Sequence, residues 1–196
     1  MSLSPQQIQQ NRKDFLNILE NTQSTIPTSL INFLDNESDF WRAPASTRYH
    51  ESYEGGLVEH SLKVYERLLH LNYQHMLNLE EESMAKAALF HDICKANFYR
   101  KTTRNRRMED GQWRRITTYE VEDQLPMGHG EKSVAVLQKH QLPLTEEEML
   151  AIRWHMGGFT EGIDSFGTGQ ALSNAMAGYT LVPALHIADM MSVWLK

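Results

Sequence analysis

Four histidines and two aspartates lie in short segments of the chain that combine polar donors with small or apolar neighbours. The residues are His60 in GGLVEHSL, His91 and Asp92 in LFHDICK, His129 in PMGHGEKS, His155 in AIRWHMGG and Asp189 in LHIADMMS. Imidazole nitrogens and carboxylate oxygens bind Zn, Mn, Fe, Ni and Mg ions. An aspartate among apolar side chains needs a cation or a hydrogen-bond partner. A lone histidine on an apolar helix face is more often a core residue, so the spacing alone leaves both interpretations open.

The segments that must position these residues read almost entirely as helix. Capping boxes at Ser4 with Gln7 and at Thr145 with Glu148 mark two helix starts. The spacing of apolar residues and the positions of helix-breaking residues predict a short helix that begins at 27 and longer helices over about 5–20, 57–75, 78–95, 128–140, 145–156 and 179–195. Loops are predicted at 41–56 and 157–170. Two strand-like runs flank Asp110-Gly111, a strong turn signal. The expected fold is an all-α bundle with one inserted β-hairpin of about residues 99–119.

The order of these motifs, with Lys95 closing the HDICK segment, resembles the HD-domain superfamily of metal-dependent phosphohydrolases. It is most similar to the HD half of bacterial 3′→5′ exoribonucleases and to two-metal HD phosphodiesterases. The resemblance covers about residues 55–195, so we expect a single domain over 1–196. In it, residues 1–54 form a helical extension and loop, and 55–195 form the metal-binding core. The sequence departs from the family pattern in having HMGG instead of a His-His pair, and the hairpin has no match in the common core.

The resemblance implies a site with two divalent metal ions, whose identity among Mn, Fe, Ni, Zn and Mg stays open. His60, His91, Asp92 and Asp189 would hold the first ion. Asp92 would bridge to a second ion held by His129 and His155. Such ions make hydroxide available near neutral pH for attack on a phosphoester. Asp92 and Lys95 are the expected catalytic residues, with Lys95 binding a phosphate oxygen; the alternative for Lys95 is an ordinary cation at a helix C-terminus.

Charge is distributed unevenly along the chain. The net charge is −6, but seven basic and two acidic residues fall between Arg100 and Arg115, so this segment carries +5 and the remainder −11. In a strand Arg104 and Arg106 share one face, while Lys101 and Arg107 take the other. Arginine suits bidentate phosphate contact, so we expect Arg104 and Arg106 to bind substrate. The alternative is a charged edge that prevents strand aggregation.

The other histidines receive lesser roles. His186, one turn before Asp189, is expected to pack or to support the site. Surface or loop positions are expected for the others that lie outside the proposed ligand set: His50, His70, His75 and His140.

These features predict an enzyme that cleaves a phosphoester of a nucleotide, a cyclic nucleotide or a short single-stranded nucleic acid. Two alternatives stay open: an HD-type di-iron oxygenase, and a nucleotide-binding sensor without turnover. The acidic remainder argues against coating long nucleic acids. No apolar run approaches the ~20 residues of a membrane span, and the first residues show no secretory signal. With Cys94 as the single cysteine, we expect a cytoplasmic protein without a membrane partner; homo-oligomer formation stays open.

Overall fold

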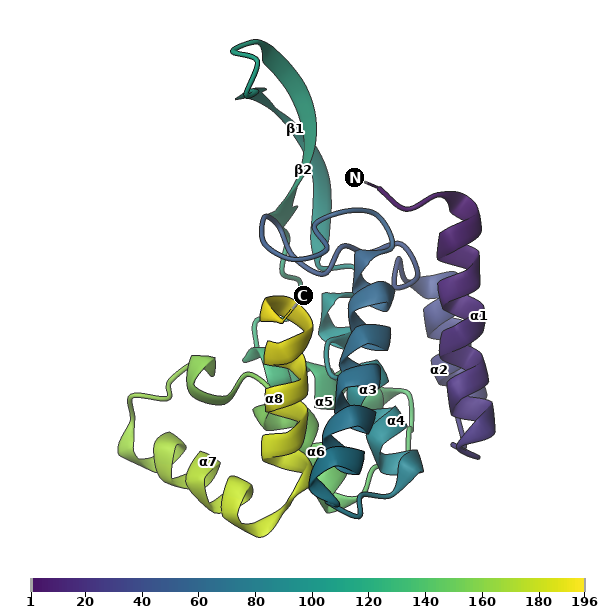
Figure 1. The fold of residues 1–196 in the computed structure, drawn as a ribbon, viewed down its shortest axis with the longest axis vertical. Helices are drawn as coiled ribbons and strands as arrows, with labels where there is room; N and C mark the ends of the chain where they lie inside the picture. Colours follow the sequence, from purple (N-terminus) through teal and green to yellow (C-terminus); the bar gives the residue numbers. More distant parts are fainter. Residues whose placement is uncertain (1, 196) are drawn as a thin grey trace.

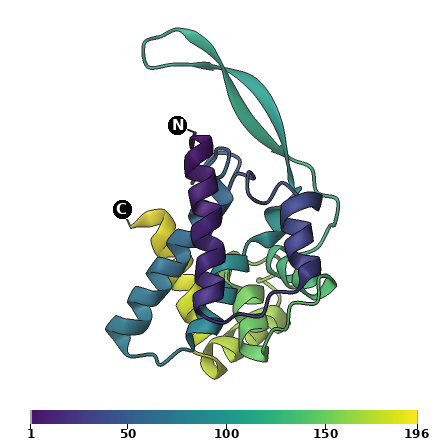
Figure 2. The same cartoon turned by 90° about the vertical axis from the view of Figure 1, so that its right-hand side faces the viewer.

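The computed structural model describes residues 2–195 as a body of helices from which one long hairpin projects (Figures 1 and 2). The helices are α1 (Pro5–Asn21), α2 (Thr28–Asn32), α3 (Gly56–His75), α4 (Glu81–Phe90), α5 (His129–Lys139), α6 (Glu146–Trp154), α7 (Phe166–Gly178) and α8 (Leu181–Trp194). A π-helical turn (Phe33–Glu37) follows α2, and 3₁₀ turns cover Ile93–Lys95 and Gly157–Phe159. The hairpin strands are β1 (Tyr99–Arg107) and β2 (Trp113–Val121). This architecture confirms the expected helical bundle with an inserted hairpin.

The core forms where α3 and α8 run side by side and meet α4 and α6 (Figure 1). Leu57 and Leu68 of α3 are fully buried, as are Ala87 and Ala88 of α4. Because alanine side chains are small, they let the helices approach closely around the polar residues at the centre. Within residues 2–195, no helix combines the length and the apolar character needed to cross a membrane.

Helix α1 is joined to this core by an aromatic cluster. Its N-terminus has the expected capping box, in which Ser4 and Gln7 satisfy each other's backbone N–H groups. Farther along, the fully buried ring of Phe15 contacts Phe40, Trp41 and Phe90 edge-on, with centroid separations of 5.3 to 5.6 Å. The N-terminal segment therefore packs directly against the end of α4.

Helix α4 is shorter at both ends than the sequence predicted. It begins at Glu81 with Glu80 as its N-cap, because Asn78 takes a left-handed conformation with φ 56°. The backbone N–H of Leu79 is bound by the side chain of Asn72 instead. The helix ends at Phe90 rather than near Lys95, and a 3₁₀ turn follows over Ile93–Lys95.

Helix α7 was not predicted, and the expected loop over 157–170 was wrong in its last part. The hydroxyl of Ser165 accepts a hydrogen bond from the Thr168 backbone and caps the helix. The sequence signal is weak because glycines occur within α7 and only Leu172 and Ala175 are buried. The helix lies at the edge of the body (Figure 1), so it lacks the broad apolar stripe by which helices are recognised.

The hairpin pairs β1 and β2 antiparallel from Tyr99 opposite Val121 to Arg107 opposite Trp113. Gly111 in the connecting turn has φ 78°, a conformation that favours glycine. Both strands leave the body together and extend well beyond it (Figure 2).

Candidate metal centre

The six predicted ligands come together at the centre of the bundle. His60 comes from α3, His91 and Asp92 from the end of α4, His129 from the start of α5, His155 from the residue after α6, and Asp189 from α8. His60 Nε2 lies 3.2 Å from Asp189 Oδ1 and 3.3 Å from His91 Nε2. Asp92 Oδ1 lies 2.6 Å from His129 Nε2 and 3.5 Å from His155 Nε2.

Both members of the His91-Asp92 pair reach this centre because α4 stops just before them. On a continuous helix, neighbouring side chains point about 100° apart. Phe90 is the last helical residue, and Asp92 has φ −107° and ψ 15°. His91 Nε2 and Asp92 Oδ2 are consequently 3.4 Å apart.

Backbone carbonyls fix the orientation of two of the imidazoles. His91 Nδ1 donates to the Ala88 carbonyl at 2.8 Å, and His155 Nδ1 donates to the Ile152 carbonyl at 2.7 Å. Each Nε2 then presents a lone pair to the centre, as in histidine metal ligands. His155 Nε2 is buried and has no hydrogen-bond partner among the described residues. An unpartnered buried nitrogen is costly, and a metal ion would satisfy it, so the residues fit the implied ions.

The position of His60 depends on α8. Its Nδ1 lies 3.3 Å from Ser192 Oγ, and this hydroxyl donates to the Asp189 carbonyl at 2.8 Å. The hydroxyl hydrogen is thus engaged, so Ser192 accepts the proton of His60 Nδ1. The lone pair of His60 Nε2 therefore faces the carboxylates.

The carboxylates of Asp92, which is buried, and Asp189, which is partly buried, give the centre negative charge. Burial alone would raise the pKa of Asp92, but Lys95, His91 and His129 hold it well below its usual range. Burial also opposes ionisation of Asp189, yet contact with His60 and the nearby imidazoles lower its pKa strongly. Burial disfavours the charged form of His91, but the two carboxylates raise its pKa overall. This donor set of histidines and ionised carboxylates suits divalent ions.

Lys95 lies in the centre itself. Its Nζ is 2.5 Å from Asp92 Oδ2, and the residue is only 9% exposed. Burial opposes its charge, but Asp92 raises its pKa overall, so the amine stays protonated. Because α4 ends five residues earlier, Lys95 lies beyond that helix, at the end of the 3₁₀ turn over Ile93–Lys95.

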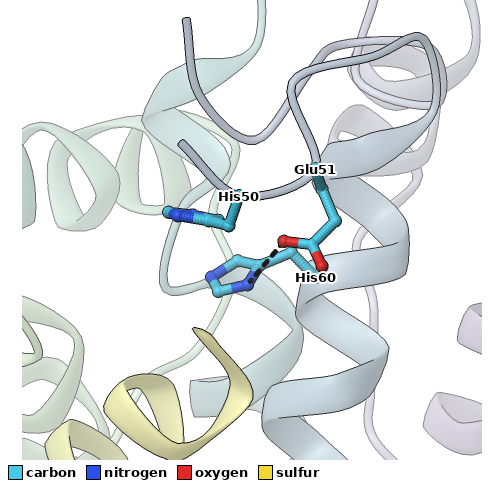
Figure 3. Close-up of side chains that lie close together, drawn as sticks. All are labelled: His50, Glu51 and His60. Carbon is cyan, nitrogen blue, oxygen red and sulfur yellow. Dashed lines mark ion pairs between the residues drawn. The ribbon is translucent and has the colours of Figure 1, made fainter. Parts of the chain in front are cut away.

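Two residues near the centre were not predicted. His50 lies in a loop, one of the two placements expected for it, but its ring centroid is 4.7 Å from that of His60, and burial is the main cause that lowers its pKa to about 4. Glu51 Oε2 lies 4.0 Å from His60 Nδ1 (Figure 3). A Cβ at Gly56 would come within 2.0 Å of the Glu51 carbonyl oxygen, so only glycine lets this loop rest on α3. The Gly-Gly pair is the sequence signal for this contact.

Two other side chains complete the surroundings. Cys94 Sγ lies 3.3 Å from His129 Nδ1. His186 Nδ1 donates to the His155 carbonyl at 2.7 Å, which places it in a supporting position. His140, expected at a surface or loop position, lies away from the centre in the turn after α5 and is not at the surface: it is 8% exposed and stacks on Phe33, because α2 and the π-helical turn cover it.

The predicted substrate-binding residues Arg104 and Arg106 are not in the metal centre but line a groove of about 530 Å³ beside the hairpin. Lys101, expected on the opposite face, lines the same groove. The groove is not confined to one face of the hairpin, since the consecutive residues Ile116 to Tyr119 of β2 line it as well.

Comparison with known proteins agrees with this geometry. The HD domain family model matches residues 57–189, a range that contains all six converging residues. A dihydroneopterin 2′,3′-cyclic phosphate phosphodiesterase of Methanocaldococcus jannaschii is 30% identical over 145 residues, which are 71% of this chain and 51% of that protein. The chain thus spans about half the length of this curated relative. No solved structure matches the chain significantly. The chain belongs to the HD-domain superfamily of metal-dependent phosphohydrolases.

Proposed function

We propose that this protein hydrolyses phosphoesters with the help of divalent metal ions bound by the six converging residues. His60, His91, Asp92 and Asp189 would hold one ion, and Asp92, His129 and His155 a second. The observation that carries the proposal is the convergence of these donors around the buried, unpartnered Nε2 of His155. The relative named for a cyclic phosphodiester supports a phosphodiester rather than another ester.

Bound divalent ions would supply positive charge for phosphoryl oxygens and hydroxide near neutral pH. Asp92 contributes a carboxylate that stays ionised, since Lys95 and the imidazoles hold its pKa low. His91 and His155 keep their Nε2 atoms aimed at the centre through their backbone hydrogen bonds. Lys95 keeps its proton, so its amine can donate a hydrogen bond to a non-bridging phosphate oxygen beside Asp92.

The proposed substrates are nucleotides, cyclic nucleotides or short single-stranded nucleic acids, with Arg104 and Arg106 binding phosphates away from the reacting ester. The two side chains lie on the same groove wall, and arginine binds phosphate oxygens in pairs.

The test is elemental analysis of the purified chain, combined with assays on phosphomonoesters, cyclic nucleotides and oligonucleotides. We expect metal-dependent hydrolysis, and loss of both metal and activity in His91→Ala and Asp92→Ala. His75→Ala is the control, because His75 is exposed at the end of α3. Turnover that requires iron and dioxygen would indicate an oxygenase instead. Ligand binding with full metal occupancy but no turnover would indicate a sensor.

A further inference from the structure

A groove lies between the hairpin and the loop over residues 47–54. We call it the basic groove, because its lining includes four cationic side chains and one carboxylate, Glu54; the cations are Arg48, Lys101, Arg104 and Arg106. Hydroxyl-bearing side chains, among them Thr117, Thr118 and Tyr119, supply much of the remaining lining. Positive charge with hydroxyl donors suits a phosphate-bearing ligand.

The cations of the basic groove are largely free, unlike the others on the hairpin. Among residues 2–195, no carboxylate forms an ion pair with Arg48, Arg104 or Arg106, and Glu54 is shared at 3.6 Å between Lys101 and Arg42. Outside the groove, the basic side chains have partners: Arg100 with Glu120 and Glu122, Arg114 with Asp110, Arg107 with the Gly111 carbonyl and Arg115 with Thr103. Arg104 and Arg106, the hairpin cations for which residues 2–195 offer no ion pair or hydrogen-bond partner, therefore both lie on the groove side.

Two chain segments that line the basic groove also lead to residues at the metal centre. Strand β1 begins at Tyr99, whose burial raises its pKa to about 12 and which lies near the charges of Lys95 and Asp92. At about 3.3 Å per residue, Arg106 lies roughly 23 Å along the strand from Tyr99. In the loop, His50 and Glu51 approach His60, while the neighbouring Arg48 lines the groove. The cations of the groove thus extend along the hairpin much farther than a mononucleotide requires.

Exposed aromatic side chains accompany these cations. Tyr49, next to Arg48, is 86% exposed, and Trp113, near the hairpin turn, is 70% exposed. Neither ring lines the groove itself, but both are close to it in the chain. Cationic grooves with exposed aromatic rings nearby are typical of surfaces that bind single strands, whose bases can stack. The −11 charge of the remaining chain disfavours a long duplex.

We propose that the basic groove binds a single-stranded oligonucleotide, with backbone phosphates on Arg48, Arg104 and Arg106. A strand bound there would run along β1 toward the metal centre. The proposal deepens the phosphohydrolase function and rests on it for the fate of the strand, but the binding itself needs no turnover.

The test measures binding of the full chain to labelled single strands of about 12 nucleotides by fluorescence anisotropy. RNA and DNA strands are compared, and EDTA is present throughout. We expect the oligomer to bind more tightly than a dinucleotide. Arg104→Ala with Arg106→Ala should weaken binding roughly ten- to hundredfold, and should reduce the log–log salt slope by about 1.4. The matched control is Arg100→Ala with Arg114→Ala, which removes the same charge from ion-paired positions of the same hairpin and should change affinity by less than about twofold.

Equal weakening by the two double variants would overturn the proposal, as would equal affinity for oligomer and dinucleotide. Tight binding of either the RNA or the DNA strand, lost only in the groove variant, would support it and identify the sugar. Metal-dependent hydrolysis of bis(p-nitrophenyl) phosphate by the unaltered protein tests the metal centre separately. Hydrolysis without strand binding would therefore refute only the proposal that the groove binds a strand. Strand binding without hydrolysis would refute only the proposed phosphohydrolase activity.

Discussion

The hydroxyl of Ser192 accepts the Nδ1 proton of His60 at 3.3 Å and donates to the Asp189 carbonyl at 2.8 Å. This contact joins a proposed ligand on α3 to the backbone of a proposed ligand on α8. Hydrogen bonds that orient ligating histidines typically contribute ten- to a hundredfold to metal affinity.

We therefore expect Ser192→Ala to bind divalent metal roughly ten- to a hundredfold more weakly, because His60 loses its fixed orientation. Competition with a chromophoric chelator measures the affinity. Ser173→Ala is the control, since Ser173 is an exposed α7 residue whose hydroxyl donates to the Gly169 carbonyl. Equal affinities for the Ser192 variant and the unaltered chain would contradict the prediction.

Removal of Lys95 should destabilise the metal-free protein far more than the metal-loaded protein. Lys95→Ala leaves the buried carboxylate of Asp92 without its cation, a loss of about 3–5 kcal/mol for a buried pair. Bound metal would compensate the same charge. Urea unfolding in EDTA and in excess Mn²⁺ measures both states.

The matched control for this comparison is Lys139→Ala, at an exposed position in the last turn of α5. It should change the free energy of unfolding little in either condition. If Lys95→Ala destabilised both states equally, Lys95 and the metal ions would not share the charge of Asp92.

Metal itself should raise the midpoint of thermal unfolding. Saturation at a hundred times Kd contributes about 2.7 kcal/mol, which for a chain of this size corresponds to roughly 5–10 °C. The buried Nε2 of His155 would gain a partner, so His155→Ala should lose most of the shift. A shift of full size in that variant would remove His155 from the proposed ligand set.

The N-terminal segment should unfold together with the core. Phe15→Ala removes a fully buried ring that contacts Phe40, Trp41 and Phe90, and should lower the free energy of unfolding by about 3–5 kcal/mol. Denaturant unfolding followed by tryptophan fluorescence and by circular dichroism should show one coincident transition. Phe159→Ala, at a residue that is 72% exposed, should have little effect. A separate early transition for the aromatic cluster would indicate an independent N-terminal unit.

The sequence could predict the helical bundle, the hairpin and the residues that meet at the centre, because each has a local signal. Capping boxes, the Asp-Gly turn and polar residues on apolar helix faces are all readable within a few positions. The HDICK segment could be recognised, but not the helix end at Phe90 that lets His91 and Asp92 face the same point.

What the sequence could not provide depends on contacts between distant segments. His50 and Glu51 reach His60 only because the loop folds back onto Gly56. Helix α7 has too few buried residues to show a periodic stripe. Lys101 and Arg104 line one groove, although alternation along a strand places them on opposite faces.

The pairing of Tyr99 with Val121 closes the hairpin where it leaves the helices. The segment between Asp92 and His129 is therefore closed by strand pairing at its base. We expect the number of residues beyond this pair to leave the positions of Asp92 and His129 unchanged. Removal of whole residue pairs near the turn would preserve the alternation of the side chains that remain. The hairpin can in this sense be lengthened or shortened, by evolution or by design, while the metal centre keeps its geometry.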